Sequence, residues 1–168
     1  MRGRFGRRFR QLRDDVLDRS LSFTQSIHEL RRGLPGLKSI SRFDLDVIER
    51  QEYGETLLVS GDGDVLETTR ASFFAVTSEG LETARPPEVL PGIGRELLLE
   101  IAAARGISVR EGAPQLKDRT HWREAFTTNA VRGVRPIIDV GGHALPSADA
   151  GSLARELQSA FDIRAGWS

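Results

Sequence analysis

The chain contains no cysteine. This absence excludes disulfide bonds, thiolate metal sites and a thiol nucleophile, and it is typical of a reducing compartment. No apolar run approaches the roughly 20 residues that span a bilayer. The Arg-rich start, MRGRFGRRFRQLR, has no apolar core and so does not resemble a secretory signal. We therefore expect a cytoplasmic protein without a membrane partner.

The chain also lacks net charge, with 24 basic and 24 acidic residues. No global field therefore favours nucleic acid. Charge is nevertheless uneven, because residues 2–13 hold several arginines and no acid before Asp14 and Asp15 follow. This basic arm could contact phosphate backbones, act as an organellar targeting segment, or form a solvated helix start. We favour the solvated start and expect no nucleic-acid partner.

Lysine is scarce, since Lys38 and Lys117 are the only two in the chain. Lys38 follows a Gly-Leu-Pro-Gly turn. An arginine would serve equally well as a surface charge, but only a primary amine forms a Schiff base with an aldehyde. The alternative is that a codon bias towards arginine left a few lysines by chance.

Apolar spacing predicts a helix over residues 8–31, ended by a Gly-Leu-Pro-Gly segment, and a shorter helix over about 41–52. The period then changes. ETLLVS and VLETT flank a Gly-Asp-Gly-Asp turn, which predicts a β-hairpin, and SFFAVT and GLET read as further strands. We expect an α+β, or mixed α/β, protein in which residues 1–32 form a basic arm and amphipathic helix and residues 33–168 form one domain.

The second half of the chain begins with a loop-helix-strand pattern in LPGIGRELLLEIAAARGISV, with Gly106 as the helix stop. EAFTTNAV and VRPIIDV read as two more strands, GGHALP as a turn, and DAGSLARELQSAFD as a closing helix capped by Asp149 or Ser152. Histidines are too scattered to predict a metal site, and we expect none.

Three of these features belong together chemically. Lys38 offers an amine, Glu67 offers a carboxylate on a half-buried strand, and Gly92 and Gly94 open a helix whose free N–H groups can bind phosphate. A glycine pair at a helix start is more often purely structural, so this last signal is weak alone. Together they are the parts of a pyridoxal phosphate site.

The order GLKSISRFDLDVI, GDVLETTRASFFAV, LPGIGRELLLEIAAARGISV and EAFTTNAVRGVRPI resembles the fold-type IV pyridoxal phosphate enzymes. These are the class IV aminotransferases and aminodeoxychorismate lyase. The resemblance implies a pseudobarrel-like domain, with Lys38 as the cofactor lysine and Glu67 facing the pyridine nitrogen. It further implies that the cofactor phosphate and the closing loop involve Gly92, Ile93, Gly94, Thr128, Asn129 and Ala130.

Within that family, Phe43 and the segment TTNAVRGVRP resemble the lyase more than the aminotransferases. The resemblance thus implies release of pyruvate from 4-amino-4-deoxychorismate to give 4-aminobenzoate, with transamination as the alternative. Arg132 and Arg135 could grip the carboxylate of a small amino substrate or lie on the surface. Ser72 stands where the family commonly has Asn.

The family usually has a small domain before the lysine, and here a predicted helix takes its place. The resemblance implies a homodimer, or a separate partner that supplies the missing part. The alternative from another functional class is a non-catalytic or partner-dependent aminotransferase-like module, which the shortened N-terminal side motivates.

Overall fold

The computed structural model describes residues 21–23, 27–29, 55–145 and 152–167. Within these residues one sheet is combined with two α-helices, α3 (Ile93–Ala104) and α4 (Leu153–Arg164), and a short 3-10 helix, η1 (Leu116–His121). The strands are β1 (Leu21–Phe23), β2 (Ile27–Glu29), β3 (Leu57–Val59), β4 (Val65–Thr68), β5 (Ser72–Val76), β6 (Leu81–Thr83), β7 (Val109–Glu111), β8 (Glu124–Asn129), β9 (Gly133–Val140) and β10 (His143–Ala144).

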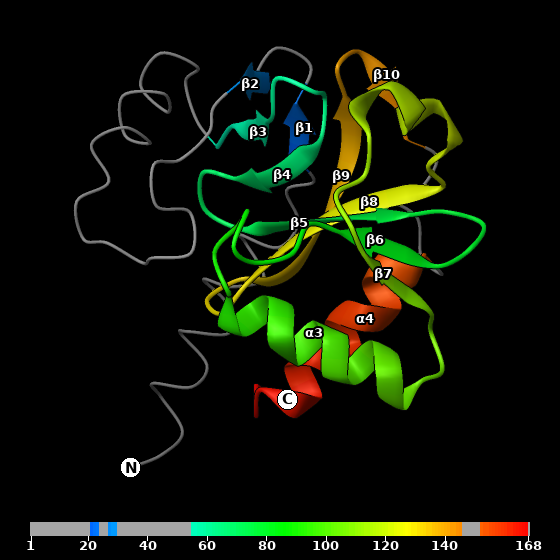
Figure 1. The fold of residues 1–168 in the computed structure, drawn as a ribbon. Coiled ribbons are helices and arrows are strands. Elements are labelled where there is room, and N and C mark those ends of the chain that lie inside the picture. The colour runs from blue at the N-terminus through cyan, green and yellow to red at the C-terminus, as the bar shows by residue number, and fades with distance from the viewer. Residues whose placement is uncertain (1–20, 24–26, 30–54, 146–151, 168) are drawn as a thin grey trace.

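The described strands join in the order β1-β9-β8-β5-β4-β3-β2, with β10 added at β9 and β6 and β7 branching from β5. The central strand pairs of this sheet are all antiparallel, namely β3–β4, β4–β5, β5–β8 and β8–β9. The sheet curls strongly, so that the strands wrap partway around a barrel (Figure 1). The architecture is therefore mixed α+β, as the strand patterns predicted. Its curled, largely antiparallel half-barrel agrees with the barrel-like domain that the family resemblance implied.

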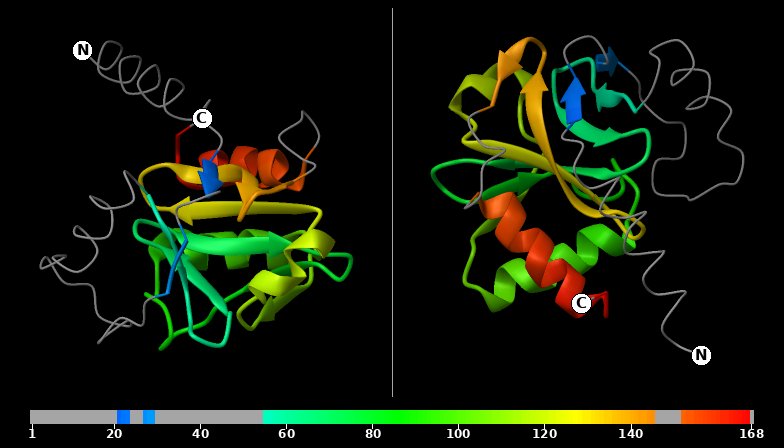
Figure 2. Two further views of the ribbon diagram at one scale, coloured as in Figure 1. Left: turned by 90° about the horizontal axis from the view of Figure 1, so that it is seen from above. Right: turned by 180° about the vertical axis from the view of Figure 1, so that it is seen from behind.

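The two faces of the sheet bury separate apolar clusters. On one face, α3 and α4 cross each other beneath the sheet (Figure 2) and pack on Phe74, Phe126 and Val134. The other face carries Phe73 and Trp122, whose ring centroids lie 5.5 Å apart. Neighbouring residues of β5 thus point to opposite faces, as the alternation of a strand requires.

Most elements predicted from residues 55–167 are confirmed. The hairpin, the strands in SFFAVT, GLET, EAFTTNAV and VRPIIDV, and both helices are present. Gly106 follows α3 with φ of 67°, the left-handed conformation expected of a glycine stop. Ser152 caps α4 by accepting a hydrogen bond from the Arg155 N–H at 3.3 Å, whereas Asp149 lies outside the described residues.

The helix predicted over residues 8–31 is wrong where the structure describes it. Leu21–Phe23 forms β1, parallel to β9, and Ile27–Glu29 forms β2, parallel to β3. Backbone pairing with strands distant in the sequence outweighs the local helical spacing, and that pairing leaves no trace in a short window. The helix predicted over 41–52 and the site lysine, Lys38, lie outside the described residues. The boundary at residue 32 stays a prediction.

Candidate functional site

The N-terminal end of α3 presents backbone donors that no N-cap side chain satisfies. Gly92 is the N-cap, in extended conformation with φ −79° and ψ 133°, and the first helical bond runs from the Glu96 N–H to the Gly92 carbonyl at 3.0 Å. The N–H groups before Glu96 have no partner inside the helix. They sit at the positive end of the dipole of a 12-residue helix, which is a favourable place for an anion.

Gly94 brings this helix end into backbone contact with the turn between β8 and β9. A β-carbon built on Gly94 would lie 2.7 Å from the Asn129 carbonyl carbon and 3.1 Å from the Ala130 nitrogen. No side chain fits at such distances without a shift of the backbone. Glycine is therefore required at position 94 for the helix start and the turn to approach each other.

Asn129 stabilises that turn with its own side chain. Its Oδ1 accepts hydrogen bonds from the N–H groups of Val131 at 3.0 Å and Arg132 at 2.8 Å, and its Nδ2 donates to the Arg70 carbonyl at 3.3 Å. The turn is thus tied both to itself and to the β4–β5 connection. Asn129 acts on the site through the backbone it holds in place.

A row of polar side chains crosses the sheet next to this contact. Glu67 of β4 pairs with Ser72 of β5, which pairs with Thr128 of β8, so the three side chains share one face. All three are buried, with exposed fractions of 5%, 7% and 2%. A β-carbon on Gly92 would lie 3.2 Å from the Ser72 Oγ. The row therefore runs up to the start of α3.

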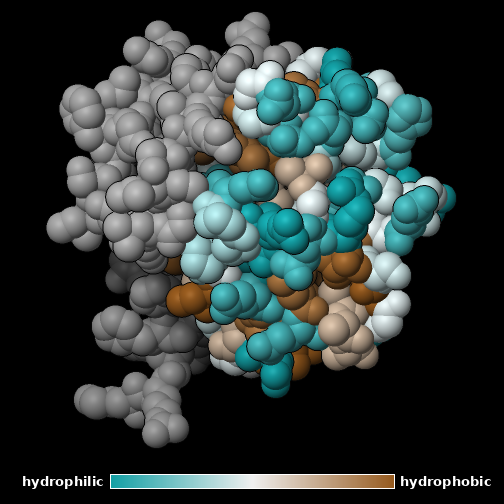
Figure 3. Space-filling model, viewed as in Figure 1, coloured by the Kyte–Doolittle hydropathy of each residue, from teal (hydrophilic) through white to brown (hydrophobic). Residues whose placement is uncertain are grey.

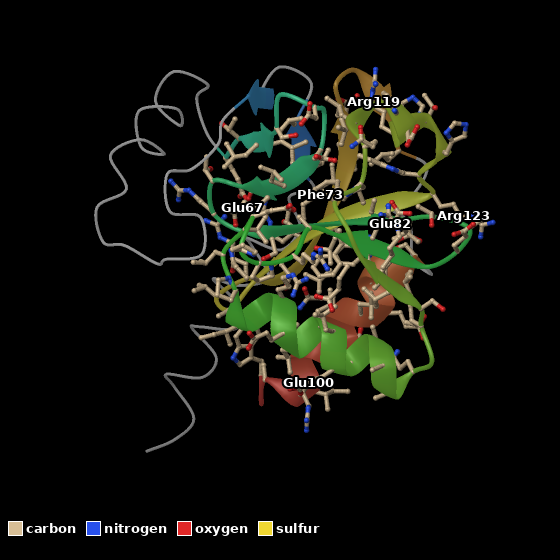
Figure 4. All side chains as sticks on the ribbon, in the orientation of Figure 1. Glu67, Phe73, Glu82, Glu100, Arg119 and Arg123 are labelled. Carbon is tan, nitrogen blue, oxygen red and sulfur yellow. The ribbon has the colours of Figure 1, made fainter. Side chains whose placement is uncertain are left out.

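Two of these polar groups differ in their surroundings, and that of Thr128 indicates a ligand. Glu67 is a buried carboxylate whose Oε2 accepts a hydrogen bond from the Leu90 N–H at 3.4 Å, in the loop leading to α3; Figure 4 shows it on β4 near that end of the helix. Thr128 Oγ1 is buried and has no hydrogen-bond partner among the residues that the structure describes. Buried hydroxyls are almost always paired, so an unpaired one beside a helix N-terminus suggests that a bound group completes it.

Arg132 and Arg135 lie in a different environment. Arg135 of β9 pairs with Thr127 of β8, which in turn pairs with Phe73 of β5. These side chains occupy the face opposite to Glu67 and Thr128. Both arginines contact Glu55 Oε2, Arg132 at 3.6 Å and Arg135 at 3.4 Å. Burial lowers the pKa of Arg135, while the Glu55 carboxylate opposes that shift and Arg132 adds to it. This arrangement favours a structural ion cluster over a substrate grip.

The structure thus brings together the described residues predicted for the phosphate side and, next to them, the carboxylate predicted for the pyridine nitrogen. The backbones of Gly92, Gly94, Asn129 and Ala130 and the side chains of Glu67 and Thr128 converge. The side chain of Ile93 is 70% exposed, so only its backbone faces the helix start. Hydrophobic surface at that end of α3 is visible in Figure 3.

Sequence reasoning missed three contributors. Leu90 supplies an N–H to Glu67, and Glu55 joins the two arginines, but neither has a local signature in the sequence. Arg95, buried in the first turn of α3, could have been noticed, because a cation opposes the helix dipole at that position.

The donors fit a phosphorylated cofactor better than a metal. Among the described residues, no group of three or more His, Asp or Glu side chains is placed to hold a metal ion. The unpaired hydroxyl and free N–H groups suit a phosphate, and a buried carboxylate suits a cationic ring nitrogen. Within the same residues, no helix has the length and apolar character needed to cross a membrane.

Comparison with known proteins identifies the family. The family model described as amino-transferase class IV matches residues 17–140, nearly three-quarters of the chain. The protein belongs to the class IV aminotransferases. The match includes Lys38, Glu67, the start of α3 and the β8–β9 turn.

Relatives and solved structures extend this finding. A putative branched-chain-amino-acid aminotransferase of Methanocaldococcus jannaschii is 30% identical over 141 residues, 79% of this chain and 48% of that protein. The branched-chain amino acid aminotransferase of Escherichia coli superposes with a TM-score of 0.68 at 21% identity, covering 84% of this chain and 52% of that one. The 4-amino-4-deoxychorismate lyase of Pseudomonas aeruginosa gives 0.71 at 21% identity, covering 86% and 54%.

At these identities the structural likeness shows the fold alone. The half-barrel with α3 and α4 therefore matches part of the class IV aminotransferase fold. The chain spans about half the length of the curated relatives it matches. Family members bind pyridoxal phosphate, and one solved branched-chain aminotransferase of this fold is complexed with N-(5'-phosphopyridoxyl)-L-glutamate.

Proposed function

We propose that this class IV aminotransferase chain binds pyridoxal 5'-phosphate and acts on a small amino acid-like substrate. The phosphate would lie beside the contact between the first turn of α3 and the β8–β9 turn, against the free N–H groups of the helix and the Thr128 hydroxyl. Glu67 would face the pyridine nitrogen and Lys38 would hold the aldehyde carbon. The observation that carries the proposal is the buried, unpaired Thr128 hydroxyl beside the free N–H groups of α3.

When bound, the cofactor supplies an electron sink for a carbanion formed at the substrate α-carbon. The residues of the chain have separate tasks. The Glu67 carboxylate, 5% exposed, stabilises a proton on the ring nitrogen because an anion of low exposure favours a neighbouring cation. The Lys38 amine, once it is released from the aldehyde carbon, would move the proton of the substrate α-carbon. The backbone N–H groups of α3 and the Thr128 hydroxyl orient the phosphate.

An absorbance titration tests this binding. Purified wild-type protein, Lys38→Ala and Lys117→Ala are mixed with pyridoxal phosphate, and the near-visible band of bound cofactor is recorded. Lys117 is the matched control because it is the other lysine and is exposed on η1. We expect the band in wild type and Lys117→Ala and its loss in Lys38→Ala. No band in any of the three would refute cofactor binding by this chain.

For the reaction, we propose the lyase type, with 4-amino-4-deoxychorismate converted to pyruvate and 4-aminobenzoate. Phe43 and the segment TTNAVRGVRP support it, because they resemble the lyases rather than the aminotransferases. Pyruvate release from this substrate is measured with Lys38→Ala as the control. Absence of pyruvate from cofactor-loaded protein would contradict the lyase proposal.

Transamination of branched-chain amino acids is the second candidate, supported by the 30% identity to the putative branched-chain-amino-acid aminotransferase of Methanocaldococcus jannaschii. It predicts that leucine, isoleucine or valine converts the bound cofactor to its amine form, with a visible loss of the near-visible band. A pyruvate assay on the same sample distinguishes the two reactions, since only the lyase reaction releases pyruvate.

The assembly is also a proposal. The family resemblance implies a homodimer, or a separate chain that completes the site, and light scattering on the purified protein measures which mass is present. If neither candidate reaction occurs although the cofactor binds, the partner-dependent or non-catalytic module becomes the preferred interpretation, and activity should return when a completing chain is added.

A further inference from the structure

Arg95 is a buried cation in the first turn of α3, only 3% exposed. Its guanidinium has two anchors of different kinds. Nε donates to the Ala84 carbonyl at 3.1 Å, just after β6, and Nη2 contacts Glu111 Oε2 on β7 at 2.7 Å. The side chain therefore joins the helix start to the segment that precedes it and to the strand that follows it.

This location is unfavourable for helix stability itself. A cation in the first turn opposes the helix dipole, and burying a charge costs free energy even when it is paired. A cation at this end does favour an anion bound there. The two-point contact of a planar guanidinium also fixes orientation in a way that a single ammonium group does not.

Gly94, the residue before Arg95, shows why the orientation of the first turn of α3 matters. Gly94 approaches the backbone of Asn129 so closely that no β-carbon fits between them. A small rotation or shift of the first turn would open that contact and separate the free N–H groups from Thr128. The anchor at Arg95 and the contact at Gly94 thus bear on the same turn from adjacent positions.

We propose that Arg95 is a positioning residue for the phosphate half of the cofactor site. The proposal rests on the proposed binding of pyridoxal phosphate. It adds that different residues act on the phosphate half and on the ring half of the site. Arg95, through Ala84 and Glu111, holds the first turn of α3 against the β8–β9 turn. Glu67, which the proposed function places at the ring, lies on β4 and is not part of that anchor. Loss of Arg95 should therefore weaken binding of a phosphorylated ring and leave binding of the unphosphorylated ring unchanged.

The experiment compares the dissociation constants of pyridoxal phosphate and pyridoxal in wild type, Arg95→Lys and Arg95→Gln. The matched control is Arg105→Gln, which removes an arginine from the other end of α3, where it pairs with Glu156 at 3.1 Å on the surface. Arg95→Lys keeps the buried charge and so is expected to fold even if Arg95→Gln does not. Glu111→Gln weakens the same ion pair from the side of Glu111, whose side chain is half-exposed.

We expect the Kd of pyridoxal phosphate to rise about tenfold in Arg95→Gln, equivalent to about 1.4 kcal/mol. Arg95→Lys and Glu111→Gln should show smaller rises, and Arg105→Gln none. The Kd of pyridoxal should be the same in all five proteins. An unchanged Kd for pyridoxal phosphate in the Arg95 variants, or equal losses for both ligands, would overturn the positioning role.

Amide hydrogen exchange separates this inference from the proposed function. The Glu96 N–H, bonded to the Gly92 carbonyl, reports on the first turn, and the Arg105 N–H, bonded to the Ile101 carbonyl, reports on the last. Faster exchange at Glu96 but not at Arg105 in Arg95→Lys supports the anchor even if wild type binds no cofactor. Equal exchange in both proteins at both positions rejects it, whatever the cofactor does.

Discussion

A β-carbon placed on Gly94 would lie 2.8 Å from the Cα of Asn129, so the first turn of α3 and the β8–β9 turn meet backbone to backbone. These two segments are separated by more than thirty residues in the sequence. Their contact places the free N–H groups of the helix beside the Thr128 hydroxyl. The proposed phosphate site is thus a property of the packing between α3 and the sheet.

Gly94→Ala should separate these two segments. We expect it to destabilise the fold by about 2 kcal/mol, because the added methyl meets backbone atoms that cannot rotate away. It should also weaken pyridoxal phosphate binding. Gly92→Ala is the control, since the nearest atom there is the Ser72 Oγ at 3.2 Å, and its cost should be nearer 0.5 kcal/mol, about that of a poorer N-cap. Urea unfolding measures the change in stability, and a titration measures the change in pyridoxal phosphate binding. Similar losses of stability and of binding in the two variants would contradict the proposed close contact at Gly94.

Thr128→Val should have opposite effects on stability and on binding. Removing a buried hydroxyl that lacks a partner should stabilise the protein without cofactor by about 1 kcal/mol, since its desolvation is uncompensated. Losing a hydrogen bond to a phosphate should raise the cofactor Kd about tenfold. Thr127→Val, on the opposite face of the same strand, should leave the Kd unchanged. A variant that is both less stable and unaltered in binding would remove Thr128 from the site.

Glu67→Gln keeps the shape of the side chain and removes its charge. We expect the cofactor to bind still, because the phosphate contacts are intact, but turnover should fall by about a hundredfold or more when the ring nitrogen loses its anionic partner. Glu82→Gln, on β6 beside Arg110, is the control and should retain activity. Initial rates with saturating cofactor provide the comparison. Full activity in Glu67→Gln would exclude the ring-nitrogen role.

Glu55→Gln should weaken the fold and not the cofactor site. The Glu55 carboxylate opposes the effect of burial on the pKa of Arg135, so its neutralisation lowers that pKa further and leaves a buried cation less well compensated. We expect a loss of about 3 kcal/mol in unfolding free energy. Arg105→Gln breaks an exposed pair and should cost less than about 0.5 kcal/mol. Chemical denaturation separates the two; a Glu55 variant as stable as wild type would mean that the cluster contributes nothing.

Local patterns predicted much of the fold after residue 55. The Gly-Asp-Gly-Asp turn, the alternation in SFFAVT and the glycines around α3 are short-range signals whose physical causes lie within a few residues. The same patterns failed for β1 and β2. β1 pairs with β9, more than a hundred residues away, and β2 pairs with β3, thirty residues away. No local window contains that information.

The candidate site also has residues that local sequence indicates and residues that only the strand pairing brings together. Glu67 and the glycines at 92 and 94 could be chosen from residue type and position, and the family resemblance assigned their roles. The polar row of Glu67, Ser72 and Thr128 depends on strand register, which fixes the face that each side chain occupies. Register also places Arg135 on the opposite face, next to Glu55, and its role in binding a substrate carboxylate stays a prediction.

Lys38 is the residue that we propose to hold pyridoxal phosphate in this chain. Borohydride reduction of the protein mixed with the cofactor, followed by proteolysis and peptide mass analysis, identifies the modified lysine directly. The account predicts a phosphopyridoxyl mass on the peptide containing Lys38, with Lys117 unmodified at equal reagent concentration. Equal labelling of both lysines, or labelling of Lys117 alone, would contradict it.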